Sequence, residues 1–221
     1  MSKKILRVYR TKEEAKTSYD RISRFYDYFE GPFERDVRGR ALEQLNVKEG
    51  ETVLEVGFGT GHCLEDMARR VGKTGKAYGI DISSGMLEIT RERLEKAGLT
   101  ERVELYRGDA MSMPYENEMF DAVFMSFALE LFDTPEIPVV LKEIKRVLKP
   151  NGRLGVVSMS KEDGESILLK LYEWLHKNFP KYADCRPIYV EQSIKDAGYS
   201  IRSKEKTKLF GLLGEIVVAK P

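Results

Sequence analysis

Between Glu51 and Met159 the sequence alternates short apolar runs with amphipathic stretches, and this alternation restricts the fold more than any other feature of the chain. Apolar runs separated by helix-length amphipathic segments are typical of parallel strands that are buried on both faces. Such a series folds as an α/β sheet with helices on its two faces. We therefore predict five strands, at Thr52–Val56, Ala77–Ile80, Val103–Tyr106, Ala122–Met125 and Leu154–Val157.

The helices between these runs have recognisable ends. One of the two serines at 83–84 can cap a helix that ends before Gly98. The next helix opens at Pro135 or Pro138, because proline is favoured in the first turn. We expect it to end in a turn over residues 149–152, whose sequence is Lys-Pro-Asn-Gly.

Ahead of this series lies a region of different character. Residues 1–45 alternate charged and aromatic side chains, which predicts one or two helices broken near Gly31-Pro32. We expect a helical cap segment there, on a main domain of residues 46–221. The two parts would fold as one globular unit, since the chain is too short for two large domains.

After Met159 the pattern predicts a long helix over Glu165–Phe179, with His176 at its surface, and a short helix near Val190–Ala197. Two strand-like segments, Tyr199–Thr207 and Glu215–Ala219, then predict an antiparallel pair at the sheet edge. The long helix would carry Leu168, Leu171, Tyr172 and Leu175 on one face. The complete pattern predicts a Rossmann-like, doubly wound α/β sheet of about seven strands, mostly parallel with an antiparallel last strand, plus the N-terminal helical cap.

One segment of the series has a distinctive chemistry. The first strand runs directly into Gly57-Phe58-Gly59-Thr60-Gly61, and a helix follows. In a doubly wound sheet this turn lies at the carboxyl edge, where ligands bind, and glycine lets a ligand approach the backbone. His62 stands where a dinucleotide fingerprint has its third glycine, and no Lys or Arg lies between Val53 and Leu64. The turn therefore disfavours a nicotinamide dinucleotide.

Three carboxylates follow or end neighbouring predicted strands. Glu55 lies just before the glycine turn, Asp81 lies 20 residues after Gly61, and Asp109 follows the third strand. A carboxylate at Asp81 can accept hydrogen bonds from both ribose hydroxyls of a nucleoside. Asp109 can accept from an adenine amine. The expected crevice is acidic, so it suits the net cationic S-adenosylmethionine better than a phosphate-bearing cofactor.

These motifs resemble those of the class I S-adenosylmethionine-dependent methyltransferases over roughly residues 15–160. Within that class the chain looks most like the ubiquinone/menaquinone-biosynthesis C-methyltransferase group. The residues that carry the resemblance are Val53–Gly61, Asp81, Gly108-Asp109-Ala110, Phe120-Asp121-Ala122 and Leu148–Gly152, supported by Tyr19–Asp27 and Met125-Ser126-Phe127.

The resemblance implies a role for each matching position. The glycine turn would contact the methionyl part of the cofactor, and Asp81 would hold its ribose. Ile82 would stack on the adenine, Asp109 and Ala110 would read the adenine edge, and Ser126 would line the methyl-donor side. With the N-terminal tyrosines, whose rings can lie against a sulfonium, the candidate cofactor-binding residues are Tyr19, Tyr26, Glu55, Gly57, Gly59, Thr60, Gly61, Asp81, Ile82, Met86, Asp109, Ala110 and Ser126.

The acceptor is less well specified than the cofactor. The quinone group typically continues its Ser-Phe pair with Gly-Leu-Arg-Asn, whereas this chain has Ala128-Leu129-Glu130-Leu131. We expect a small apolar, aromatic or lipid-like acceptor, methylated by in-line displacement. A phospholipid or amine N-methyltransferase and a non-catalytic S-adenosylmethionine-binding or scaffold protein remain alternatives. An apolar acceptor pocket would be formed by Leu129, Leu131, Phe132, Tyr172 and Leu175.

No nucleophilic triad is evident, and methyl transfer needs none. His62, Glu130 and Asp133 are candidates for a general base or an acceptor contact. For His62 a loop hydrogen bond is the favoured interpretation. The two cysteines lack metal-ligand spacing, so no metal site is expected.

The charge balance restricts the partners. The chain has 37 Lys and Arg against 36 Asp and Glu, a formal net charge of +1, so we expect no nucleic-acid partner. No run approaches the roughly 18 apolar residues of a membrane span, so no stable membrane insertion is expected. Residues 1–10 lack the apolar stretch of a signal peptide, and a cytoplasmic location is the default expectation. The sequence does not indicate an oligomeric state.

Overall fold

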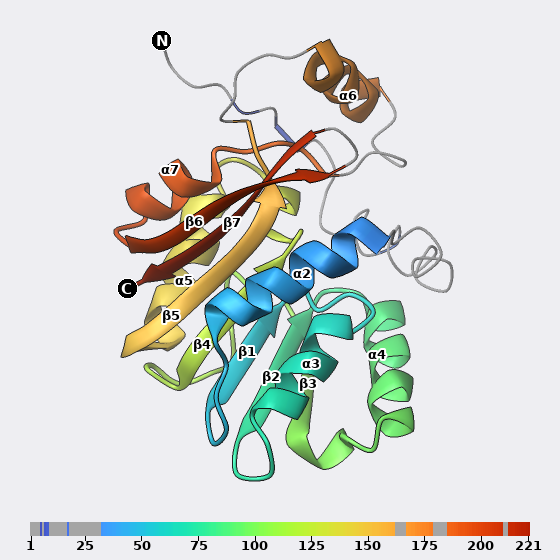
Figure 1. Cartoon of the computed structure of the whole chain (residues 1–221), viewed down its shortest axis with the longest axis vertical. Coiled ribbons are helices and arrows are strands. Elements are labelled where there is room, and N and C mark those ends of the chain that lie inside the picture. Colours follow the sequence, from blue (N-terminus) through green and yellow to red (C-terminus); the bar gives the residue numbers. More distant parts are fainter. Residues whose placement is uncertain are drawn as a thin grey trace.

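The computed structural model describes residues 5, 7–8, 17, 32–161, 167–178, 185–209 and 212–221. They contain a seven-stranded sheet of order β3-β2-β1-β4-β5-β7-β6 (Figure 1). Strand β7 is antiparallel to both of its neighbours, and the other strand pairs are parallel. The predicted doubly wound sheet with a reversed last strand is confirmed. The strands are β1 (Thr52–Val56), β2 (Lys76–Asp81), β3 (Val103–Arg107), β4 (Phe120–Ser126), β5 (Leu148–Met159), β6 (Ser200–Leu209) and β7 (Leu212–Lys220).

Helices cover both faces of the sheet, and its apolar residues divide between two clusters accordingly (Figure 1). One face packs against α2, α3 and α4, and the other against α5 and α7. The division follows from the alternation of side chains along each strand. On β1, Val53 packs in the cluster on the α2, α3 and α4 side, while Leu54 and Val56 pack in the cluster on the α5 and α7 side. The helices are α2 (Pro32–Leu45), α3 (His62–Arg70), α4 (Ser84–Lys96), α5 (Ile137–Val147), α6 (Ile167–Asn178) and α7 (Val190–Asp196), with 3-10 turns η1 (Thr100–Arg102) and η2 (Leu129–Leu131).

Helix α2 is the largest described part of the predicted cap segment. It begins at Pro32, where the Gly31-Pro32 break predicts a boundary, and it packs on β5 and β7 with Leu42 and Leu45 fully buried. Among the described residues, no helix is both long enough and apolar enough to cross a membrane.

The turn predicted after α5 is wrong in its form. Residues 149–152 lie within β5, as a bulge between the pairs Phe120–Leu148 and Ala122–Arg153. The Lys149 ammonium lies 2.7 Å from an Asp121 carboxylate oxygen on β4, so the bulge stays attached to the sheet. The expected end of the helix is confirmed, since α5 ends at Val147, but the Lys-Pro-Asn-Gly segment itself bends a strand instead of forming a turn.

Helix α6 is rotated about its axis relative to the sequence prediction. Leu171 and Trp174 are exposed at 53% and 54%, while Leu169 and His176 are buried. The inner stripe therefore runs through Leu169, Tyr172 and His176, at helical spacing. The Tyr172 hydroxyl donates to the Cys185 carbonyl at 3.1 Å, which holds this face inward. The expectation of a surface His176 is thus wrong, and the side chains of Leu168 and Leu175 lie outside the described set.

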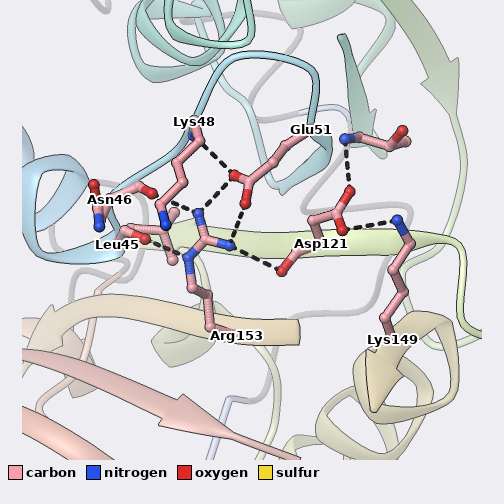
Figure 2. Close-up of polar contacts among 8 residues, drawn as sticks. Leu45, Asn46, Lys48, Glu51, Asp121, Lys149 and Arg153 are labelled. Atoms are coloured by element: carbon pink, nitrogen blue, oxygen red, sulfur yellow. Dashed lines mark hydrogen bonds and ion pairs between the residues drawn. The ribbon is translucent and has the colours of Figure 1, made fainter. Parts of the chain in front are cut away.

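A polar cluster joins the amino ends of β1, β4 and β5; we call it the amino-edge cluster and define it as Leu45, Asn46, Glu51, Asp121, Lys149 and Arg153. Figure 2 shows the Arg153 guanidinium at its centre. Arg153 binds both Glu51 carboxylate oxygens, at 2.9 and 2.7 Å, and donates to the carbonyls of Leu45, Asn46 and Asp121. The Thr52 N–H donates to Asp121 at 2.9 Å. These contacts join the end of α2 to three strands of the sheet.

Candidate functional site

The glycine turn between β1 and α3 lies at the carboxyl edge of the sheet, as predicted. Gly57, Gly59 and Gly61 have φ of 73°, 51° and 82°, in the left-handed region that favours glycine. A Cβ on Gly57 would lie 2.7 Å from the Cβ of Ala128, so this close approach excludes any side chain there. A Cβ on Gly59 would meet no heavy atom within 4 Å. The turn therefore packs tightly against the β4 side and is open at Gly59.

Asp81, at the end of β2, bridges the glycine turn and the start of α4. One carboxylate oxygen accepts from the Gly59 N–H at 3.0 Å, and the other from the Ser83 N–H at 2.9 Å. The Ser83 hydroxyl in turn accepts from the Met86 N–H at 3.1 Å and caps α4, which confirms the predicted cap. Asp81 is thereby fixed beside the open part of the turn.

Two side chains of α4 hold the turn from behind, and the sequence does not single them out. The Thr90 hydroxyl donates to the Gly59 carbonyl at 2.9 Å, and the Arg93 Nε donates to the Thr60 carbonyl at 2.7 Å. They are three residues apart and so share one helix face. The one sequence signal that could have identified them is that two polar residues occupy the inner face of a predicted helix.

His62, a candidate base, lies at the start of α3 and contacts Arg93. Its Nε2 is 2.9 Å from an Arg93 guanidinium nitrogen. Because a guanidinium only donates, Nε2 is the acceptor and is engaged within the turn. The geometry accords with the loop-bonding interpretation of His62.

The acidic residues follow strands that are neighbours in the sheet. Glu55 lies on β1 and is 2% exposed, while Asp109 lies two residues after β3. The Asp109 carboxylate accepts from the Met111 N–H at 3.0 Å, which folds the chain back at this point. Beside them, Met86 and Ala110 are buried and Ile82 is half-buried.

Two hydroxyl oxygens at this edge are buried without a hydrogen-bond partner among the described residues. They are the Oγ1 of Thr60, in the glycine turn, and the Oγ of Ser126, at the end of β4. A buried polar atom with no partner is destabilising unless a ligand or water satisfies it. Both atoms therefore mark this edge as a place for a polar ligand.

Glu130 and Asp133, the two acidic candidates after β4, have opposite surroundings. Glu130 is fully buried, and burial raises its pKa to about 7. Burial also acts to raise the pKa of Asp133, but hydrogen bonds from Arg7, at 2.6 to 2.9 Å, and from the Val8 N–H lower it to about 2. Asp133 is thus a paired anion, and Glu130 is the group that can change its charge near neutral pH.

The structure describes only part of the predicted tyrosine contacts and of the predicted acceptor pocket. Tyr19 and Tyr26 lie outside the described residues. Of the expected acceptor pocket, Leu129 is fully buried, whereas Leu131, Phe132 and Tyr172 are half-buried. Among the described residues, no group of three or more His, Cys, Asp or Glu side chains could hold a metal ion.

Comparison with known proteins agrees with this arrangement. Residues 53–152 match the family model described as a methyltransferase domain. Two demethylmenaquinone methyltransferases are similar in sequence: one of Lactobacillus johnsonii, 35% identical over 66% of this chain and 59% of its own length, and one of Staphylococcus aureus, 37% identical over 67% and 61%. The chain thus spans about three fifths of the length of these curated relatives.

Solved structures share the fold. A SAM-dependent methyltransferase of Aquifex aeolicus superposes with a TM-score of 0.67 and 24% identity, covering 90% of this chain and 98% of that one. The cyclase SpnF superposes with a TM-score of 0.78 and 21% identity, covering 98% and 97%. Residues 53–152 therefore resemble a methyltransferase domain in sequence, and the chain shares the fold of these solved structures.

Proposed function

We propose that the chain methylates a small quinol-like acceptor with S-adenosylmethionine. The observation that carries the proposal is the glycine turn, which is open at Gly59 and has the Asp81 carboxylate fixed at that opening. The matching family model and the two relatives named as demethylmenaquinone methyltransferases support it.

The residues of the turn fit this cofactor. Each Asp81 oxygen accepts one backbone N–H. A carboxylate oxygen can accept more than one hydrogen bond, so the chemistry of Asp81 suits ribose hydroxyls as donors. The open side of Gly59 allows the backbone to approach the ligand. The unsatisfied hydroxyls of Thr60, in the same turn, and of Ser126, at the end of β4, offer polar contacts for the amino-acid end of the cofactor.

The cofactor, when bound, supplies a methyl group on a positively charged sulfur. The chain's own part is to hold donor and acceptor in line and to keep water out, because alignment supplies much of the rate enhancement in such a displacement. Glu55, Asp81 and Asp109 give this edge of the sheet a negative character that favours the cation over anionic ligands.

Two observations support the choice of acceptor: the similarity to relatives named demethylmenaquinone methyltransferases, and the apolar surroundings of η2. Leu129 is fully buried and Phe132 half-buried beside the end of β4. Such surroundings favour an aromatic ring over a highly charged substrate. The Ala128–Leu131 sequence differs from that of the quinone group, so phospholipid and amine acceptors belong in the same test.

The test incubates the purified chain with S-adenosylmethionine and, separately, a demethylated naphthoquinol, a phosphatidylethanolamine vesicle and a small amine. Formation of S-adenosylhomocysteine and of the methylated product is measured by mass spectrometry. The naphthoquinol should gain one methyl group at the highest rate. Binding of S-adenosylhomocysteine without transfer to any acceptor would overturn the enzymatic part, and the cyclase SpnF shows that this fold also occurs in a protein named for another activity.

A further inference from the structure

A buried carboxylate follows the residue that packs against the glycine turn. Ala128, whose Cβ would touch any side chain at Gly57, leads into η2, where Glu130 is fully buried two residues later. The Met159 N–H, at the end of β5, donates to the Glu130 Oε1 at 3.2 Å. Glu130 is therefore held at the carboxyl ends of β4 and β5, two residues after the Ala128 that packs against Gly57.

A buried arginine comes to the same place from a distant part of the sequence. Residues 185–189 run along the end of β5, where Ser160 and Ile188 form a parallel bridge and the Ile188 N–H donates to the Met159 carbonyl at 3.1 Å. This segment carries Arg186, whose side chain is fully buried. One of its nitrogens, Nη2, donates to the Phe132 carbonyl.

Three polar atoms of this pair are not satisfied by the described part of the chain. They are the Oε2 of Glu130 and the Nε and Nη1 of Arg186, all buried and without a hydrogen-bond partner. The nearby Asp133 is already bound bidentately by Arg7 and by the Val8 N–H. Leaving charged groups buried with unsatisfied hydrogen-bonding atoms is costly, so a ligand that satisfied all three atoms would be bound with a clear preference.

The charges around the pair agree with this interpretation. Burial lowers the pKa of Arg186 to about 10, against the negative charges of Asp133 and Glu130, so the guanidinium stays positive at neutral pH. Burial raises the pKa of Glu130, against hydrogen bonds from Ser158 and Met159 and the charge of Arg186, so its carboxyl group both gains and loses a proton near neutral pH.

We propose that Glu130 and Arg186 together bind an oxygen substituent on the acceptor ring, with the ring hydroxyl donating to the Glu130 Oε2 and its oxygen accepting from the Arg186 Nε or Nη1. This proposal rests on the proposed function and adds the group by which the acceptor is recognised.

The composition of the pair selects among acceptor classes. A hydroxyl is both a donor and an acceptor, so it satisfies a carboxylate and a guanidinium at once. A phosphate would place its negative charge against Glu130, and an ammonium would place its positive charge against Arg186. A ring hydroxyl or its tautomeric carbonyl is therefore the group that both residues accept.

The experiment uses two ring compounds of nearly equal shape, 2-naphthol and 2-methylnaphthalene, which do not themselves undergo the redox chemistry of a quinol. Their dissociation constants are measured by calorimetry on the full chain saturated with S-adenosylhomocysteine. The wild type should bind 2-naphthol at least about tenfold more tightly, as expected for a hydroxyl that meets a charged partner. Arg186→Met should reduce this preference to about twofold or less.

Two further variants keep the result interpretable. Arg153→Met removes a hydrogen-bonded, partly buried arginine at the opposite edge of the sheet, and its preference for 2-naphthol should equal that of the wild type. If Arg186→Met does not fold, Glu130→Gln, which keeps the side-chain size, decides by the same ratio. An unchanged ratio in the folded variant, or no preference in the wild type, would overturn the inference. A wild type that fails to bind S-adenosylhomocysteine would instead overturn the proposed function.

Discussion

At the scale of single residues, Asp81 combines a structural and a ligand-binding task. Its two oxygens accept from the Gly59 and Ser83 N–H groups, and a carboxylate oxygen can accept more than one hydrogen bond. The freed Gly59 N–H would lie at a half-buried residue, whereas Ser83 is buried, so substitution should weaken ligand binding and also destabilise the turn.

We predict that Asp81→Ala weakens binding of S-adenosylhomocysteine at least tenfold, since each lost charge-assisted hydrogen bond contributes about 1.5–3 kcal/mol. Asp81→Asn, which keeps one acceptor oxygen, should lie between this variant and the wild type. Isothermal calorimetry gives the affinities, and Glu92→Ala, at a 70% exposed side chain of α4, is the control. Equal affinity of Asp81→Ala and the wild type would show that the ribose binds elsewhere.

Glu130 makes the free energy of unfolding depend on pH. Its folded-state pKa is about 7 against an ordinary value of 4.5, so the folded chain retains this proton while the unfolded chain releases it. The contribution is fully present below pH 4.5 and is lost as the pH rises through 7. The charged neighbours Arg186 and Asp133, with pKa values of about 10 and about 2, do not titrate in this window.

Replacing Glu130 with Gln removes that titration. Relative to the variant, the wild type should lose on the order of 3 kcal/mol of unfolding free energy between pH 4.5 and pH 8. Urea denaturation of both proteins at several pH values measures the difference, in which the other carboxylates cancel. A difference that does not vary with pH would mean that Glu130 is ionised like an exposed glutamate.

At the scale of elements, α4 supports the glycine turn as well as covering the sheet. Thr90 and Arg93 reach the Gly59 and Thr60 carbonyls, so the position of the turn depends on the seating of the helix. A substitution on α4 that does not contact the ligand should therefore still change the position of the turn and the affinity for the ligand.

Thr90→Val keeps the shape of the side chain and removes the hydroxyl that holds Gly59. We expect a loss of about 1 kcal/mol in unfolding free energy, the usual value of one hydrogen bond. The amide protons of residues 57–62 should exchange faster by hydrogen-exchange mass spectrometry. Thr74→Val, at an exposed threonine outside α4, is the matched control and should leave exchange in the turn unchanged.

The elements were largely predictable, because each depends on local pattern. All seven strands appear where apolar runs and turn signals predict them, and α4 begins at its predicted serine cap. The errors arose where contacts over long sequence distances prevail: Lys149 binds Asp121 and turns an expected loop into a strand bulge, and Tyr172 binds Cys185 and sets the rotation of α6.

The site divides in the same way. Its backbone parts follow from glycine and carboxylate at strand ends, which the sequence displays directly. Arg93 and Arg186 could not be predicted in this way, because each contacts a residue far away in the sequence. Arg93 contacts His62, 31 residues earlier, and Arg186 donates to the carbonyl of Phe132, 54 residues earlier. No local pattern distinguishes such an arginine from one that faces solvent.

At the scale of the whole molecule, the two edges of the sheet have different tasks. The amino-edge cluster joins the end of α2 to β1, β4 and β5, while the carboxyl edge holds the glycine turn. Stability and ligand binding should therefore be separable by mutation.

Arg153→Met tests this separation. It leaves Glu51 and three carbonyls without their donor, so the free energy of unfolding should fall by about 2–4 kcal/mol. Affinity for S-adenosylhomocysteine at 25 °C should stay within twofold of the wild type. Guanidinium denaturation and calorimetry on the same preparation measure both, and a fall in affinity beyond threefold would show that the two edges are coupled.

The strand order β5-β7-β6 also has a consequence for how the chain is made. Strand β6 leaves the ribosome before β7, yet it has no place on the sheet until β7 lies between it and β5. Until then Leu154–Met159 of β5 presents an apolar, unpaired edge of the kind that associates with other chains. At this edge the order of the strands in the sheet, β5-β7-β6, differs from their order of synthesis. The sheet is therefore completed late, after β7 has been made. A chaperone that shields β5 would act between the synthesis of β5 and that of β7.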